Sequence, residues 1–153
     1  MVAAGERGVR QVWFGLEPPA AARRSGGSPS PRARAVLERA LEELELYFRG
    51  ELERFASPLD LCDQGTPFDR AVWEALLSIP HGETRSYGEV ARALGRPGAA
   101  RAVGHACGRN PLPVMVPCHR VVGANGSLTG FGGGIALKSR LLSLETAAGI
   151  RSR

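Results

Sequence analysis

Apolar residues recur at helical spacing over residues 35–49, acidic residues occupy the other face, and Gly50 supplies a stop. This pattern predicts an amphipathic helix. Upstream, residues 9–14 have the composition of a strand, and residues 2–4 are expected to form a very short hairpin partner. Residues 18–31 are rich in Pro, Gly, Ser and Ala without an apolar period, which predicts a loop or flexible linker.

The next apolar stripes predict three more helices. Thr66 is a typical N-cap for a stripe that ends before Pro80. Ser86 can cap a short helix over residues 87–94, and a third helix is predicted over residues 98–109. Two short helices joined by a tight glycine-containing turn are typical of a helix-turn-helix, but an ordinary helical hairpin is about as common. Only the arginines of the second helix favour DNA as a partner.

The remaining pattern predicts a strand, a loop and a closing helix. Residues 114–116 are an apolar run that predicts a short strand leading directly into Cys118. Residues 123–134 form a glycine-rich loop, which is not a phosphate-binding loop because no Lys-Ser or Lys-Thr pair follows its last glycine. Residues 136–145 are expected to form a helix that closes the fold.

A chain of 153 residues that is 43% hydrophobic can bury one core with an appended lobe. The expected fold class is α/β. We expect a small N-terminal lobe with β-structure over residues 1–62, followed by a mostly helical domain over residues 63–153 that carries the helix-turn-helix.

Basic residues concentrate in the C-terminal half of the chain. Up to residue 65 there are nine arginines against ten acidic residues, whereas from residue 66 onward eleven basic residues stand against five acidic ones. Such asymmetry is expected of a surface that meets a phosphate backbone. An arginine-rich composition produces the same asymmetry without any partner, so charge alone leaves both interpretations open.

The cysteines argue against disulfides and zinc. The chain has three cysteines, an odd number with no C-x-x-C pair, namely Cys62, Cys107 and Cys118. Free thiols suit a reducing cytoplasm. No uncharged apolar run approaches the ~18 residues of a membrane helix, and the first residues lack the apolar block of a signal peptide. We expect a soluble cytoplasmic protein without a bound metal.

The pair Cys118-His119 is the main chemical candidate. A cysteine is nucleophilic as a thiolate, which requires a neighbour that takes its proton or lowers its pKa. However, successive side chains of a strand point to opposite faces, so the two can communicate only across a turn or through a water. Taken by itself, the pair is better explained as a small buried hydrophobe and a core histidine.

The surrounding stretch of residues 110–122, NPLPVMVPCHRVV, resembles the active-site signature of the O6-alkylguanine-DNA alkyltransferases. The likeness covers residues 35–145 closely and residues 9–14 loosely. Its further matches are Gly65-Thr66-Pro67-Phe68, Trp73, residues 79–88, residues 100–104, Gly126, Phe131, Gly133-Gly134, Lys138 and residues 141–145. The resemblance implies DNA repair by irreversible, single-use transfer of an alkyl group to the protein itself.

The resemblance also implies the catalytic roles. Cys118 would attack the alkyl carbon as a thiolate, and His119, oriented by Glu145, would take the thiol proton through a water. Tyr87 would donate a hydrogen bond to guanine N3 and crowd the backbone phosphate. Outside the resemblance, Glu145 is a polar residue near a helix end and Tyr87 an amphipathic residue at a helix start.

On the DNA side, the target nucleotide must be rotated out of the stack. The resemblance implies that Arg101 fills the gap, whereas a phosphate contact or a solvated face is the alternative. Small residues would let the recognition helix approach the minor groove closely. The implied DNA-binding set is Arg101, Ala100, Ala102, Gly104, Tyr87 and Ser86.

The implied base pocket is built around the glycine-rich loop. Its wall is formed by residues 130–134, and the carbonyls of Cys118 and Val121 would read the exocyclic amine. Asn110 would link the recognition helix to the active-site turn, and Arg120 is expected to be structural. The implied substrate-binding set is Asn110, Val121, Phe131, Gly132 and Gly133.

The chain departs from the commoner pattern at Asp69, His81, Cys107 and Phe131, where glutamine, tyrosine, asparagine and tyrosine are usual. The family's N-terminal lobe usually opens with another strand before the segment matching residues 2–4, so a trimmed lobe is expected.

The expected partner is double-stranded DNA containing O6-alkylguanine, bound by a monomer without a cofactor, with cooperation along DNA left open. The expected location is a bacterial or archaeal cytosol, at the nucleoid. One alternative is an alkyltransferase-like protein that binds damage without transfer, although such relatives lack the cysteine. The other is a cysteine hydrolase, which accounts for neither the helix-turn-helix nor the basic half.

Overall fold

The computed structural model describes residues 1–15 and 28–151, and the chain divides into two compact units, residues 1–63 and 64–153. Most of the predicted linker, residues 18–31, lies outside the described residues. No helix in the described ranges is long and apolar enough to span a membrane.

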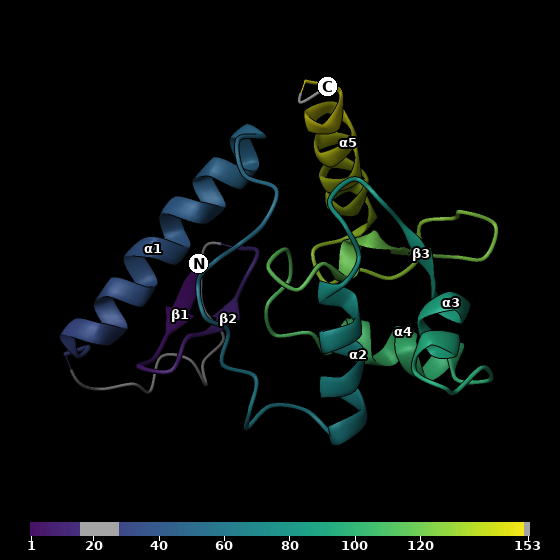
Figure 1. Ribbon diagram of the computed structural model, residues 1–153, viewed down its shortest axis with the longest axis horizontal. Coiled ribbons are helices and arrows are strands. Elements are labelled where there is room, and N and C mark those ends of the chain that lie inside the picture. The colour runs from purple at the N-terminus through teal and green to yellow at the C-terminus, as the bar shows by residue number, and fades with distance from the viewer. Residues whose placement is uncertain (16–27, 152–153) are drawn as a thin grey trace. The chain divides into compact units, whose positions relative to one another are not determined.

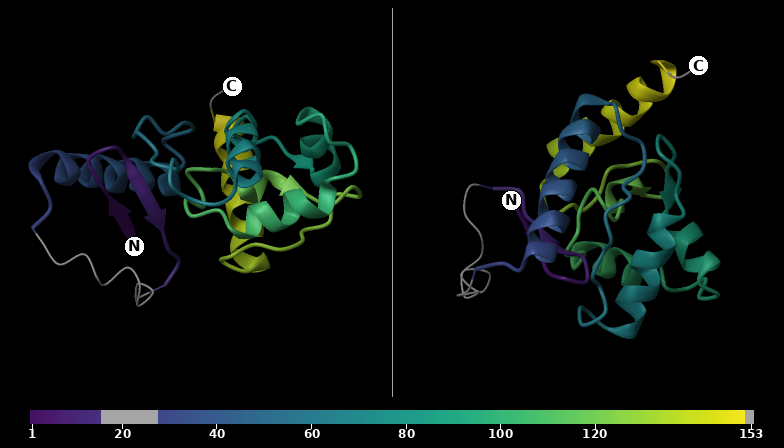
Figure 2. Two further views of the ribbon diagram at one scale, coloured as in Figure 1. Left: turned by 90° about the horizontal axis from the view of Figure 1, so that it is seen from below. Right: turned by 60° about the vertical axis from the view of Figure 1, so that its left-hand side comes forward.

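The first unit is a hairpin covered by one helix (Figure 1). Strands β1 (Val2–Ala4) and β2 (Val9–Val12) pair antiparallel, so the predicted hairpin is confirmed. Helix α1 (Pro31–Arg49) packs against them, and Figure 2 shows the helix next to the hairpin. It begins four residues before the predicted start because Ser30 accepts a hydrogen bond from the Ala33 N–H and Pro31 suits the first helical position.

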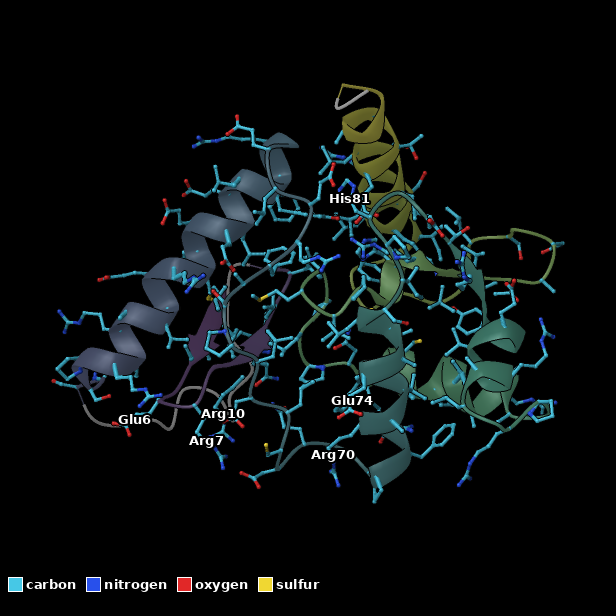
Figure 3. The ribbon with its side chains drawn as sticks, in the orientation of Figure 1. Glu6, Arg7, Arg10, Arg70, Glu74 and His81 are labelled. Atoms are coloured by element: carbon cyan, nitrogen blue, oxygen red, sulfur yellow. The ribbon has the colours of Figure 1, made fainter. Side chains whose placement is uncertain are left out.

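A buried carboxylate ties this unit together after α1. Glu43 is 8% exposed and accepts hydrogen bonds from the backbone N–H groups of Ala56 and Ser57. At the hairpin turn, Arg7 and Arg10 project from the same region (Figure 3) and pair with the buried carboxylate of Asp60. These bonds hold the segment that follows α1 against β2.

The second unit contains the predicted helices with small changes at their ends, except that the closing helix continues six residues past the predicted end at residue 145. Its elements in chain order are α2 (Pro67–Leu77), β3 (Arg85–Ser86), α3 (Tyr87–Ala93), α4 (Ala100–Gly108), the 3₁₀ turn η2 (Cys118–Arg120), β4 (Val121–Val122) and α5 (Ile135–Arg151). Helices α3 and α4 lie side by side as the predicted helix-turn-helix (Figure 1). Thr66 and Ser86 cap α2 and α3, each in a reciprocal capping box, with Asp69 and Glu89 respectively.

Trp73 anchors the core of this unit. Its side chain is 1% exposed, and its indole N–H donates to the Ala106 carbonyl of α4 at 2.9 Å. Apolar side chains from α2, α4, α5 and the segment after α4 are buried in the same unit, namely Val72, Leu76, Val103, Leu112 and Leu141. The parallel pairing of β3 with β4 brings the start of α3 next to the end of η2.

The predicted strand over residues 114–116 is wrong. These residues are buried, but they form a turn in which the Val116 N–H donates to the Leu112 carbonyl and Val114 has φ 78°. Prolines at 111, 113 and 117 lack the N–H groups that a strand needs, so the segment bonds to itself. Burial explains its apolar composition without a sheet.

Candidate active site

The turn η2 changes how Cys118 and His119 relate to each other. The Arg120 N–H donates to the Pro117 carbonyl and the Val121 N–H to the Cys118 carbonyl, so the chain turns at the two residues instead of extending. Both side chains are buried, with 5% of Cys118 and none of His119 exposed. The condition that the chain must turn at this pair is therefore met.

Behind His119 lies a fully buried carboxylate. Glu145 Oε1 is 2.7 Å from His119 Nε2, and the guanidinium of Arg120 donates to both carboxylate oxygens at 2.9–3.2 Å. The Gly82 N–H donates to Oε2 at 3.0 Å, and Arg120 also donates to the Ile79 carbonyl. Since Glu145 only accepts hydrogen bonds as a carboxylate, we assign the imidazole proton to Nε2, which leaves the lone pair on Nδ1.

Asn110 contacts the sulfur of Cys118 directly. Its Nδ2 donates to Cys118 Sγ at 3.1 Å and to the Val116 carbonyl at 2.9 Å, and its Oδ1 accepts the Leu112 N–H. All the hydrogen-bonding atoms of this amide are therefore directed. Burial raises the pKa of the Cys118 thiol, while the Asn110 hydrogen bond and the charge of Lys138 oppose that rise.

The electrostatics of the pair favour neutral groups at rest. Burial lowers the pKa of His119, against the raising effect of Glu145, and burial raises the pKa of Cys118. These shifts favour a protonated thiol and a neutral imidazole at rest, and a neutral imidazole can act as a base. Cys118 can therefore stay a thiol at rest and lose its proton to His119 when an electrophilic carbon is bound.

Tyr87 and Lys138 meet at Thr129, in the middle of the glycine-rich loop. The Tyr87 hydroxyl donates to the Thr129 carbonyl at 3.1 Å, and the fully buried Lys138 Nζ donates to the carbonyls of Thr129 and Val121 at 2.8 and 2.5 Å. Lys138 Nζ also lies 5.8 Å from the centre of the Tyr87 ring. These bonds fasten both ends of the segment between Val121 and Thr129 to α5.

Of the predicted pocket residues, Asn110 contacts the thiol and Phe131 contacts His119. Phe131 places its ring edge-on to His119 with centroids 6.5 Å apart, while Gly132 is exposed and Gly133 half-buried. The carbonyls of Cys118 and Val121 already accept hydrogen bonds from the Val121 N–H and from Lys138. A carbonyl has two lone pairs, so each could still accept a bond from a substrate amine.

The predicted DNA-side residues lie on the first turns of α3 and α4. Arg101 and Ala102 are exposed, and Ala100 is half-buried. Gly104 lies against the Tyr87 ring, so that a Cβ added at this glycine would lie 3.7 Å from a ring carbon. The Ser86 side chain is engaged in the capping box with Glu89. The hydroxyl of Ser86 therefore caps helix α3 in this structure.

Residues 67–147 match the family described as 6-O-methylguanine DNA methyltransferase, DNA binding domain. The chain is also 60% identical over 106 residues to a methylated-DNA–protein-cysteine methyltransferase of Mycobacterium leprae, an alignment that covers 69% of this chain and 63% of the relative. The chain belongs to the methylated-DNA–protein-cysteine methyltransferase family. It thus spans just under two thirds of that relative.

Other members of the methylated-DNA–protein-cysteine methyltransferase family extend the match. A Mycobacterium tuberculosis protein of the same name is 56% identical over 122 residues, covering 80% of this chain and 71% of the relative. The crystal structure of Mycobacterium tuberculosis OGT in complex with DNA aligns with a TM-score of 0.82 and 48% identity, over 96% of this chain and 86% of that one. The mixed α/β fold class expected from the sequence is confirmed.

Some features of this methyltransferase-family site were not assigned from the sequence. The Asn110 bond to sulfur and the two carbonyl bonds of Lys138 depend on tertiary contacts. A signal for Lys138 was present, because a lysine at a helical position facing the core needs buried acceptors. For Asn110 the only local signal was an amide next to a proline at a helix end.

Proposed function

We propose that this protein repairs DNA directly, by moving the alkyl group of O6-alkylguanine to the Sγ atom of its own Cys118. The observation that carries the proposal is the buried array behind the thiol, in which Glu145 orients His119 while Asn110 contacts the sulfur. All residues involved lie in residues 64–153, to which we assign both DNA binding and transfer.

The proposed reaction is one displacement. The thiol proton passes to His119 Nδ1, through a water, and Sγ attacks the alkyl carbon on the side opposite O6. The S–C bond forms as the C–O6 bond breaks, the electron pair stays on the purine, and guanine takes up one proton. Burial raises the pKa of Tyr87, so its hydroxyl remains a donor at neutral pH and can serve guanine N3 once it leaves the Thr129 carbonyl.

The product explains why the transfer would happen once. A thioether is a poor leaving group and offers water no carbonyl to attack, so the alkyl group stays on the protein. A cysteine hydrolase forms a thioester instead, which water can cleave. Because the substrate is genomic DNA, the proposed place of action is the cytosol, at the nucleoid.

The test is stoichiometric transfer. The full chain is incubated with duplex DNA containing one O6-methylguanine, and the intact protein mass is measured. We expect a gain of one methyl group per molecule, located on the peptide that contains Cys118. An unchanged protein mass would contradict the proposal and favour a protein that binds damaged DNA without transfer. Repeated turnover of a small ester would favour a hydrolase.

We propose further that Arg101 supports nucleotide rotation in duplex DNA. Arg101→Ala should slow transfer from duplex DNA about tenfold or more, because rotation costs a few kcal/mol that the side chain helps to offset. Transfer from the free base O6-methylguanine should be unchanged. Arg92→Ala removes another exposed arginine of the helix-turn-helix and is the matched control. If both variants lose the same transfer rate on duplex DNA, Arg101 only contacts phosphate and does not support nucleotide rotation.

A further inference from the structure

The end of α4 is fastened to the start of α2 by an ion pair that the proposed mechanism does not use. Arg109 donates to Asp69 Oδ1 at 2.6 Å through Nη2 and to Oδ2 at 3.2 Å through Nε. Asp69 has no exposed surface, and its Oδ2 also accepts from the backbone N–H and the hydroxyl of Thr66, both at 2.9 Å. The guanidinium lowers the pKa of Asp69 to about 2.

These bonds hold the Asp69 side chain in one orientation. A carboxylate held by an N-cap on one side and by a two-pronged guanidinium on the other has little rotational freedom. One turn earlier in α4, the Ala106 carbonyl accepts the Trp73 indole N–H. Three hydrogen bonds to two residues of α2 therefore set the position of the last turn of α4.

Asn110 follows Arg109 directly. Its amide contacts Cys118 Sγ, the Val116 carbonyl and the Leu112 N–H, so the direction of the amide depends on where α4 ends. A hydrogen bond from an amide N–H to sulfur favours the thiolate, and it weakens steeply as distance and angle depart from the optimum. A small shift of the helix end therefore changes how well the protein stabilises the thiolate.

We propose that Asp69 and Arg109 are positioning residues for the nucleophile, which act through Asn110 to keep Cys118 reactive. The role in alkyl transfer rests on the proposed function, whereas the effect on the thiol does not. The Asp69–Arg109 ion pair would affect the reactivity of the thiol as well as packing, because Asn110, whose position it sets, contacts the sulfur.

The experiment measures alkylation of Cys118 by iodoacetamide at several pH values, with the modified peptide identified by mass. A C62S background removes the exposed thiol, and the buried Cys107 thiol has its pKa raised to about 12 by burial. We expect R109Q to slow the reaction roughly three- to tenfold at pH 7 to 8, because a displaced amide weakens its hydrogen bond to the thiolate without removing it, so only part of that bond's contribution is lost. The rate profile should move to higher pH, because the substitution leaves in place the other titratable groups that interact with the thiol, namely Lys138, Cys107 and Tyr87.

Two further variants separate this role from stability. D69N should reproduce the effect of R109Q, and R109Q should add no further loss in an N110A background, because both act on the same bond. The matched control is R7Q, which removes an arginine from the buried Asp60 in residues 1–63. Arg7 and Arg109 are 56% and 53% exposed, so the two losses are comparable, and R7Q should leave the alkylation rate unchanged.

The proposal is overturned if R109Q and D69N react at the parental rate, if R7Q slows the reaction as much, or if the R109Q and N110A losses multiply. Transfer from O6-methylguanine DNA is followed in parallel. If the parent protein gains no methyl group, the proposed function fails, and the iodoacetamide rates still decide whether the ion pair positions the thiol.

Discussion

Cys118→Ser is expected to bind methylated duplex DNA and to accept no methyl group. Serine preserves the shape of the side chain, but its hydroxyl is far less acidic than a thiol and does not become an anion beside a neutral imidazole. The Asn110 bond and the Lys138 charge that oppose the raised pKa of the thiol would then act on a group that stays neutral. The measurement is intact mass after exposure to O6-methylguanine DNA, together with a DNA-binding titration.

Cys107→Ser is the matched control for this prediction. Cys107 is also buried, and burial raises its pKa to about 12, whereas the Cys118 sulfur accepts the Asn110 hydrogen bond that opposes its own rise, so we expect Cys107 to be the poorer nucleophile. The variant should therefore gain one methyl group at the parental rate. A methylated Cys118→Ser protein, with the methyl group on the peptide of Cys107, would show that the wrong thiol has been assigned.

Local sequence signals predicted the helices and their caps. The Thr66 and Ser86 caps act within three residues, so neither depends on the rest of the fold. The hairpin and the helix-turn-helix also follow from contacts between neighbours in the chain. The end of α5 was predicted too early because residues 146–149 are small or polar and interrupt the apolar stripe.

The prediction failed where long-range contacts decide the structure. Residues 114–116 were assigned to a strand because their apolar composition reports burial and not the type of backbone. The pair of Asp69 and Arg109 joins residues 40 positions apart, and no pattern in either segment points to the other. In contrast, the grouping of Glu145 with His119 came from the family resemblance, since 26 positions separate them.

Glu145→Gln is expected to cost both stability and transfer. The carboxylate accepts from His119, Arg120 and Gly82 in a site without solvent, and an amide can accept on one side only. The NH2 group of glutamine would face another donor and leave the guanidinium of Arg120 without its counter-charge. Breaking a buried ion pair from one side destabilises a protein by about 3 kcal/mol, so we expect a clearly lower melting temperature.

The loss of transfer has a separate cause. Glu145 raises the pKa of His119 against the effect of burial, so its removal makes the imidazole a weaker base, and an amide NH2 facing Nε2 would move the ring proton to Nδ1. Transfer should slow about 100- to 1,000-fold near pH 7, the usual contribution of a general base. The rate should recover as pH rises, because hydroxide can then remove the thiol proton directly.

Glu43→Gln separates these two effects. Glu43 is also buried and also accepts two backbone N–H groups and an arginine, but it lies in residues 1–63. It should lower the melting temperature and leave single-turnover transfer at the parental rate. If Glu145→Gln behaves in the same way, with full transfer at pH 7, then Glu145 serves only to bury Arg120, and His119 needs no orienting carboxylate to take the thiol proton.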